Sequence, residues 1–150
     1  MSTRFQSAVP ALAQGEEAVE LHSDVFVERT STDTSGNPQT VLEEPKVVVP
    51  GDKLVFVLRY HNGGQRPASA FVVTNPIPAA VAFEAAPDGA ATVSVDGGRS
   101  WGRLSTLTIR QADGTPRAAR PEDVTHVRWA FAQPIPAGEA GRLMFRGIVR

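Results

Sequence analysis

Apolar and polar residues alternate along several short stretches of the chain. The clearest stretch is 53–61, in which every second residue from Leu54 to Tyr60 is apolar. A repeat of two residues places successive side chains on opposite faces of an extended strand. A similar repeat over 125–132 places Trp129 on the apolar face. These patterns predict strands that bury one face and leave the other in water.

Turn-forming residues separate the alternating stretches. The chain holds 13 glycines and 12 prolines, and they lie between apolar runs rather than in one tract. This distribution is typical of many tight turns. Residues 30–44 are polar, and we expect a loop or crossover there. We predict strands over residues 16–29, 46–49, 53–61, 69–74, 80–84, 92–96, 104–110, 125–132 and 142–149.

The spacing of these strands predicts an all-β fold. Short strands at intervals of about 8–12 residues are typical of a β-sandwich. No helix-length pattern lies between them, which disfavours a parallel α/β fold. We therefore expect an immunoglobulin-like β-sandwich of about seven to nine antiparallel strands with Greek-key connections.

Length and composition narrow the class of protein. A chain of 150 residues has the size of one domain, and we assign residues 16–150 to it. The net charge of -1 does not favour binding to nucleic acid. The chain has no cysteine, and this excludes disulfides and thiolate chemistry. No apolar run is long enough for an integral membrane helix.

The N-terminal residues 1–15 allow two interpretations. Ala11-Leu12-Ala13 resembles the small-residue end of a secretory signal, although the apolar segment that precedes such an end is missing. These residues are then the remnant of a signal peptide. The alternative is a flexible N-terminal arm.

Several turn motifs occur in an order that resembles a known family. They are Pro50-Gly51-Asp52, Tyr60-His61-Asn62-Gly63-Gly64, the run Ala68–Pro78, and Ile135-Pro136-Ala137-Gly138 before the last strand. This order resembles the bacterial conserved repeat domain, also called domain of unknown function eleven, over about residues 45–150. The resemblance implies an immunoglobulin-like fold and a secreted or surface-exposed bacterial protein. The resemblance implies no catalysis and brings no active-site residues.

Catalytic and metal-binding patterns do not emerge from the sequence. The three histidines, His22, His61 and His126, fall on the polar faces of their strands and have no ligand spacing. Asp96-Gly97-Gly98 and Asp113-Gly114 fit hairpin turns better than calcium loops. We expect no catalytic site, no metal site and no cofactor, and hence no enzyme.

Two features are candidates for partner contacts. In the first strand, Val19, Leu21, Val25 and Val27 form one apolar face, which packs in its own sheet or is donated to a neighbouring copy. Trp101 follows a glycine-rich turn and is a candidate exposed anchor, although the sequence favours its packing over an end of the sandwich.

These observations favour a non-catalytic secreted, periplasmic or cell-surface module. We expect structural or adhesive contacts with itself or with other envelope proteins. One alternative is a filament subunit, or other homo-oligomer, joined by donation of residues 16–29. Another is a carbohydrate-binding module that uses Trp101 as a stacking platform.

Overall fold

The computed structural model describes residues 12–14, 18–87 and 91–150. The described residues form strands and two single 3-10 turns, η1 and η2. In chain order the elements are β1 (Leu12–Gln14), β2 (Val19–Thr32), β3 (Pro38–Glu43), β4 (Lys53–Asn62), β5 (Val72–Pro76), β6 (Val81–Ala85), β7 (Ala91–Ser94), η1 (Leu104–Thr106), β8 (Thr108–Arg110), β9 (Pro116–Ala118), η2 (Pro121–Asp123), β10 (His126–Ala130) and β11 (Ala140–Val149).

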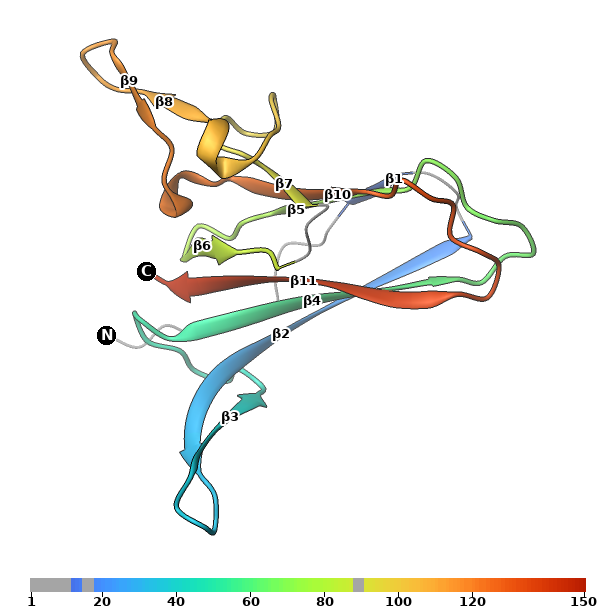
Figure 1. Cartoon of the computed structure of the whole chain (residues 1–150), viewed down its shortest axis with the longest axis horizontal. Helices are drawn as coiled ribbons and strands as arrows, with labels where there is room; N and C mark the ends of the chain where they lie inside the picture. Colours follow the sequence, from blue (N-terminus) through green and yellow to red (C-terminus); the bar gives the residue numbers. More distant parts are fainter. Residues whose placement is uncertain (1–11, 15–17, 88–90) are drawn as a thin grey trace.

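Two antiparallel sheets pack face to face. One has four strands in the order β1-β5-β10-β7, and the other has five in the order β3-β2-β4-β11-β6. Figure 1 shows the two layers, with the short hairpins β2–β3 and β8–β9 extending away from them in opposite directions. The predicted all-β sandwich is confirmed. The immunoglobulin-like connectivity stays a prediction.

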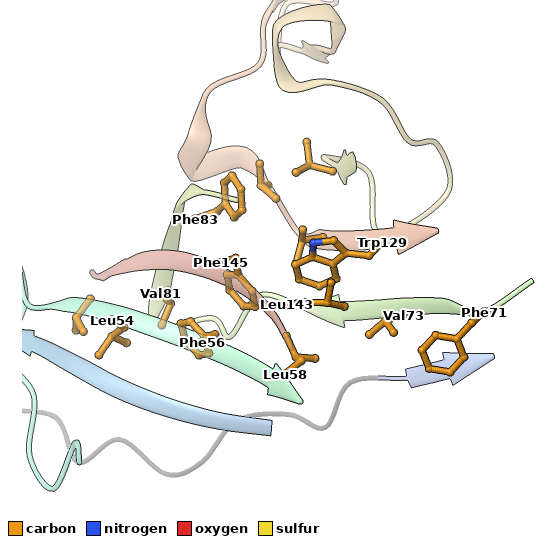
Figure 2. Close-up of a cluster of buried hydrophobic side chains, with 14 of the residues drawn as sticks. Leu54, Phe56, Leu58, Phe71, Val73, Val81, Phe83, Trp129, Leu143 and Phe145 are labelled. Atoms are coloured by element: carbon orange, nitrogen blue, oxygen red, sulfur yellow. The ribbon is translucent and has the colours of Figure 1, made fainter. Parts of the chain in front are cut away.

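Aromatic rings fill the space between the sheets. Phe56 on β4 and Phe145 on β11 lie directly opposite each other, and their rings stack with centroids 4.5 Å apart. Trp129 reaches Phe145 from the other sheet, with ring centroids 6.2 Å apart (Figure 2). The alternation in the sequence thus identifies the inward faces of these strands.

The central strand β4 is buried on both faces. Leu54 points inward, whereas Val55 and Val57 lie on the outer face and are 1% and 8% exposed. Phe26, an exception to the polar face of its strand, lies directly opposite Val55, and Met144 lies directly opposite Val57. An apolar patch therefore crosses the middle of the outer face of the five-stranded sheet.

The loop predicted over 30–44 is wrong. β2 runs on to Thr32 and forms a hairpin with β3, paired from Val27–Glu43 to Thr32–Pro38. The hairpin projects from the body of the sandwich, so both of its faces are largely exposed to solvent. Its sequence therefore shows no alternation of apolar and polar residues. Residues 46–49 form no strand; Val48 alone is fully buried.

Other boundaries also differ from the predictions. Leu12–Gln14 pair with β5, so part of the expected arm 1–15 is an edge strand, whereas residues 1–11 and 15 lie outside the described residues. The strand predicted over 104–110 is a 3-10 turn followed by β8, and its partner β9 was not predicted.

A buried asparagine joins the loops at one end of the sandwich. Asn62 is fully buried, and its side-chain amide donates to the carbonyls of Arg66 and Ile135, each at 2.9 Å. Its side-chain oxygen accepts from the backbone N–H of Gly64 at 3.0 Å. Ala68 and Ile135 exchange two further backbone bonds at 2.9 Å. Asn62 therefore links the end of β4 to the loop that follows β10.

We expect Asn62→Ala to lower the free energy of unfolding by about 3 kcal/mol, because it leaves buried backbone groups without partners. Urea unfolding monitored by circular dichroism measures this change. The matched control Asn37→Ala lies in an exposed turn, and we expect it to cost less than about 1 kcal/mol. Equal effects of the two substitutions would contradict the role of Asn62.

Candidate interaction surface

The β2–β3 hairpin is closed by an aspartate-centred turn. The Asp33 carboxylate accepts from the backbone N–H of Ser35 at 2.9 Å and of Asn37 at 2.8 Å. Gly36 has a φ of +84°, a left-handed conformation that glycine adopts without strain. The polar residues of this turn thus favour a hairpin rather than a long loop.

The segment after β3 alternates between core and solvent. Val48 is fully buried in the core, whereas its neighbours Val47 and Val49 are 51% and 43% exposed. The turn that follows is held by Asp52, whose carboxylate accepts from the backbone N–H of Val49 at 3.0 Å. Gly51 in this turn has a φ of +95°. The two outward valines are therefore fixed by a buried neighbour and a tight turn.

Arg29 on β2 connects the hairpin to that turn. Its guanidinium lies 3.6 Å from the Glu43 carboxylate on β3 and 3.5 Å from the Asp52 carboxylate. Exposed pairs of this kind contribute about 1 kcal/mol or less each. Their role here is geometric, because they hold the end of β3 beside the start of β4.

These features define what we call the β3 surface: the free edge of β3 together with Leu42, Val47 and Val49. Leu42 is 50% exposed, and these three are the large apolar residues that are exposed in the described part of the chain. Among the described strands, β3 pairs only with β2. An edge strand beside exposed apolar side chains is a template for pairing with another chain.

The sequence did not point to the β3 surface. Residues 30–44 were predicted to be a loop, and 46–49 a strand with no assigned role. The usable signal was local: Val41-Leu42 interrupts an otherwise polar stretch, and Val47 and Val49 flank a valine just before Pro50-Gly51.

The apolar face of β2 is engaged within the chain. Val27 is buried, and Val19, Leu21 and Val25 are partly buried against the core. β2 pairs with β4 in the same molecule from Val19–Asn62 to Glu28–Lys53. β2 is thus a strand of its own sandwich in this structure. Donation of residues 16–29 to a neighbour stays a prediction.

Trp101 is half-buried and packs over the outer face of the four-stranded sheet. The Arg128 guanidinium carbon lies 4.4 Å from the centre of its ring, and His126 meets it edge-on at 6.3 Å between centroids. A cation over an indole face is an attractive contact. One face of the indole is therefore occupied by Arg128.

The turn before Trp101 is built around Asp96. Its carboxylate accepts from the Ser100 hydroxyl at 2.6 Å, the Ser100 backbone N–H at 3.0 Å and the Ser94 hydroxyl at 2.7 Å. These hydrogen bonds, those of Ser100 first, hold the pKa of Asp96 well below its usual range. The Asp96-Gly97-Gly98 run is therefore a hydrogen-bonded turn.

A second hydrogen-bonded carboxylate supports the β8–β9 hairpin. Asp123 accepts two bonds from the Arg117 guanidinium, at 2.7 and 2.9 Å. These bonds lower the pKa of Asp123 from 3.8 to about 2. Near the tip, the side-chain and backbone donors of Thr115 lower the pKa of Asp113.

The histidines lie on two different sheets. His22 and His61 are on the outer face of the five-stranded sheet, and His126 is on the other sheet beside Trp101. Over residues 12–14, 18–87 and 91–150, no group of three or more histidine, aspartate or glutamate side chains is placed to hold a metal ion. Neither 3-10 turn in these ranges has the length or apolar character to cross a membrane.

Comparisons with protein-family models, with curated proteins and with solved structures find no match to this chain. The resemblance to the conserved repeat domain therefore stays a prediction.

The lowered pKa of Asp123 gives a pH prediction. Its ion pair stabilises the folded chain above pH 3.8, the ordinary pKa, and this contribution is lost as the pH falls through about 2. We expect the Asp123 carboxyl carbon to titrate near pH 2 in an NMR experiment. Arg117→Ala should move the midpoint back toward 3.8, whereas Glu122→Gln should leave it almost unchanged. A midpoint near 3.8 in the unmodified chain would contradict the pairing.

Proposed function

We propose that this chain is a non-catalytic binding module that acts through protein–protein contacts at the β3 surface. The observation that carries this proposal is a strand edge that pairs with no other strand in the described part of the chain, together with three exposed apolar residues in the stretch 42–49. Single exposed apolar residues are ordinary, but a group of them beside a strand edge suits a partner strand.

The chemistry of the β3 surface indicates which kind of peptide segment it would bind. Backbone groups along β3 pair with an extended segment of any sequence, so the affinity comes largely from main-chain hydrogen bonds. Specificity comes from apolar side chains of that segment, which pack over Leu42 and the two valines. Glu43 and Glu44 lie beside them, so a segment with a basic flank complements the end of β3.

The proposed setting is a secreted or cell-envelope protein of a bacterium. This part rests on the sequence: the resemblance to the conserved repeat domain and the signal-like run Ala11-Leu12-Ala13. A sandwich that presents an exposed edge fits a structural or adhesive module whose partner is another protein of the same compartment.

Photo-crosslinking in the producing cells tests the proposal. A benzophenone amino acid at Val47, which is 51% exposed, should yield a discrete protein adduct. The matched control is the same amino acid at Thr108, an exposed position on the opposite hairpin, and it should yield none. An adduct between two copies of the chain would favour the self-assembling alternative.

Cell fractionation of the same samples tests the setting, and we expect the adduct in the envelope or secreted fraction. The binding proposal is wrong if Val47 and Thr108 give the same products, or if Leu42, Val47 and Val49 all give none. Recovery of the chain solely from the cytosol would refute the envelope part and leave the binding part standing.

A further inference from the structure

Three basic residues lie side by side on the outer face of the five-stranded sheet. His22 on β2 is directly opposite Arg59 on β4, and Arg59 is directly opposite Arg142 on β11. Side chains at directly opposed positions in neighbouring strands have Cβ atoms about 5 Å apart. The register of three strands thus forms one row of basic groups, which we call the basic row.

Like charges at opposed positions destabilise a sheet, so the row needs negative charge nearby. The Asp24 carboxylate provides part of it and lies 2.9 Å from Arg59. His61, beside the row, is 3.8 Å from the Glu20 carboxylate. Within the described residues, Arg142 is exposed and has no carboxylate partner. In the part of the chain that the structure describes, one guanidinium of the row is therefore left without a carboxylate partner.

The basic row borders a hollow that has room for a ligand group. The hollow has a volume of about 400 Å³ and is lined by His22, Arg59, Tyr60, His61, Ala140, Gly141 and Arg142. Ala140 lies opposite His61, where a longer side chain would fill the space beside Arg142. The lining residues therefore combine an open space with guanidinium and imidazole donors.

We propose that this hollow binds an oxyanion, namely a carboxylate, sulfate or phosphate group. Arg142 donates to the anion from one side, and Arg59 shares its guanidinium between the anion and Asp24. Guanidinium groups suit this role because their planar donors match the oxygens of such anions. His22 and His61 flank the site and add donors. The site lies at the end of β2 away from the β3 hairpin, so this proposal is independent of the β3 surface.

Asp24 gives the proposal a distinctive consequence. Because its carboxylate already pairs with Arg59, it competes with any bound anion. Asp24→Asn removes the competitor and should tighten anion binding. If Asp24 served only to hold Arg59 in place for the fold, the same substitution would leave anion binding unchanged or weaken it.

The experiment is an NMR titration of the full chain with inorganic phosphate, sulfate and acetate, at constant ionic strength set with sodium chloride. We expect saturable shifts at Arg59, His22 and Arg142, and the ranking of the three salts identifies the preferred anion. Arg142→Ala should weaken binding about tenfold. Asp24→Asn should strengthen it about threefold.

The control is Arg110→Ala, which removes one exposed arginine from the β8–β9 hairpin. It should change the dissociation constant by less than about twofold, because it alters the net charge but not the site. The proposal is overturned if the shifts do not saturate, or if Arg142→Ala and Arg110→Ala have the same effect. It is also overturned if Asp24→Asn leaves binding unchanged or weakens it while its circular dichroism spectrum stays native.

Discussion

The buried side chain of Asn62 determines how one end of the sandwich closes. Asn62 ends β4 in the five-stranded sheet, and Ile135 lies just beyond β10 of the four-stranded sheet. The hydrogen bond from the Asn62 side-chain amide to the Ile135 carbonyl therefore crosses between the two layers. The backbone of Asn62 adds two more hydrogen bonds. Its N–H donates to the Glu139 carbonyl at 2.9 Å, and its carbonyl accepts from the Gly138 N–H at 2.8 Å. These bonds fix the approach of β11, whose Phe145 ring is central in the core.

The motifs that resemble the conserved repeat domain have a physical explanation in this closure. Asn62 and Ile135 come from two of those motifs, and they meet in space although they lie far apart in the chain. A third motif closes the opposite end of the same strands: Gly51 donates to the Val149 carbonyl at 2.8 Å, and Val149 donates to the Asp52 carbonyl at 2.9 Å. Residues that look like separate turns in the sequence thus act together as hydrogen-bonded ends of one sandwich.

The alternation of apolar and polar residues was sufficient to predict the strands that bury one face. Residues 53–61 and 125–132 were predicted to within about two residues of β4 and β10, because the core imposes a repeat of two on them. The β2–β3 hairpin was missed because it projects from the body and buries neither face. The burial of Val55 and Val57 was also missed, since it depends on neighbours from other strands.

Functional positions were harder to predict because they also depend on neighbours from other strands. The basic row depends on the register that brings His22, Arg59 and Arg142 together, and no local pattern carries register between strands distant in the chain. The surroundings of Trp101 were hard to predict for the same reason. Its glycine-rich context left both an exposed anchor and packing over an end of the sandwich open, because the contact with Arg128 comes from a strand that lies later in the sequence.

The two tryptophans occupy different electronic environments. The Trp129 indole is 1% exposed, and its N–H has no hydrogen-bond partner among the residues that the structure describes. The Trp101 indole lies at the surface under a cation and beside a histidine ring. An indole shielded from water emits at shorter wavelength than one in contact with it. The ultraviolet emission of the chain therefore combines a signal from a buried indole in the core with a signal from a half-buried indole on the outer face of the four-stranded sheet.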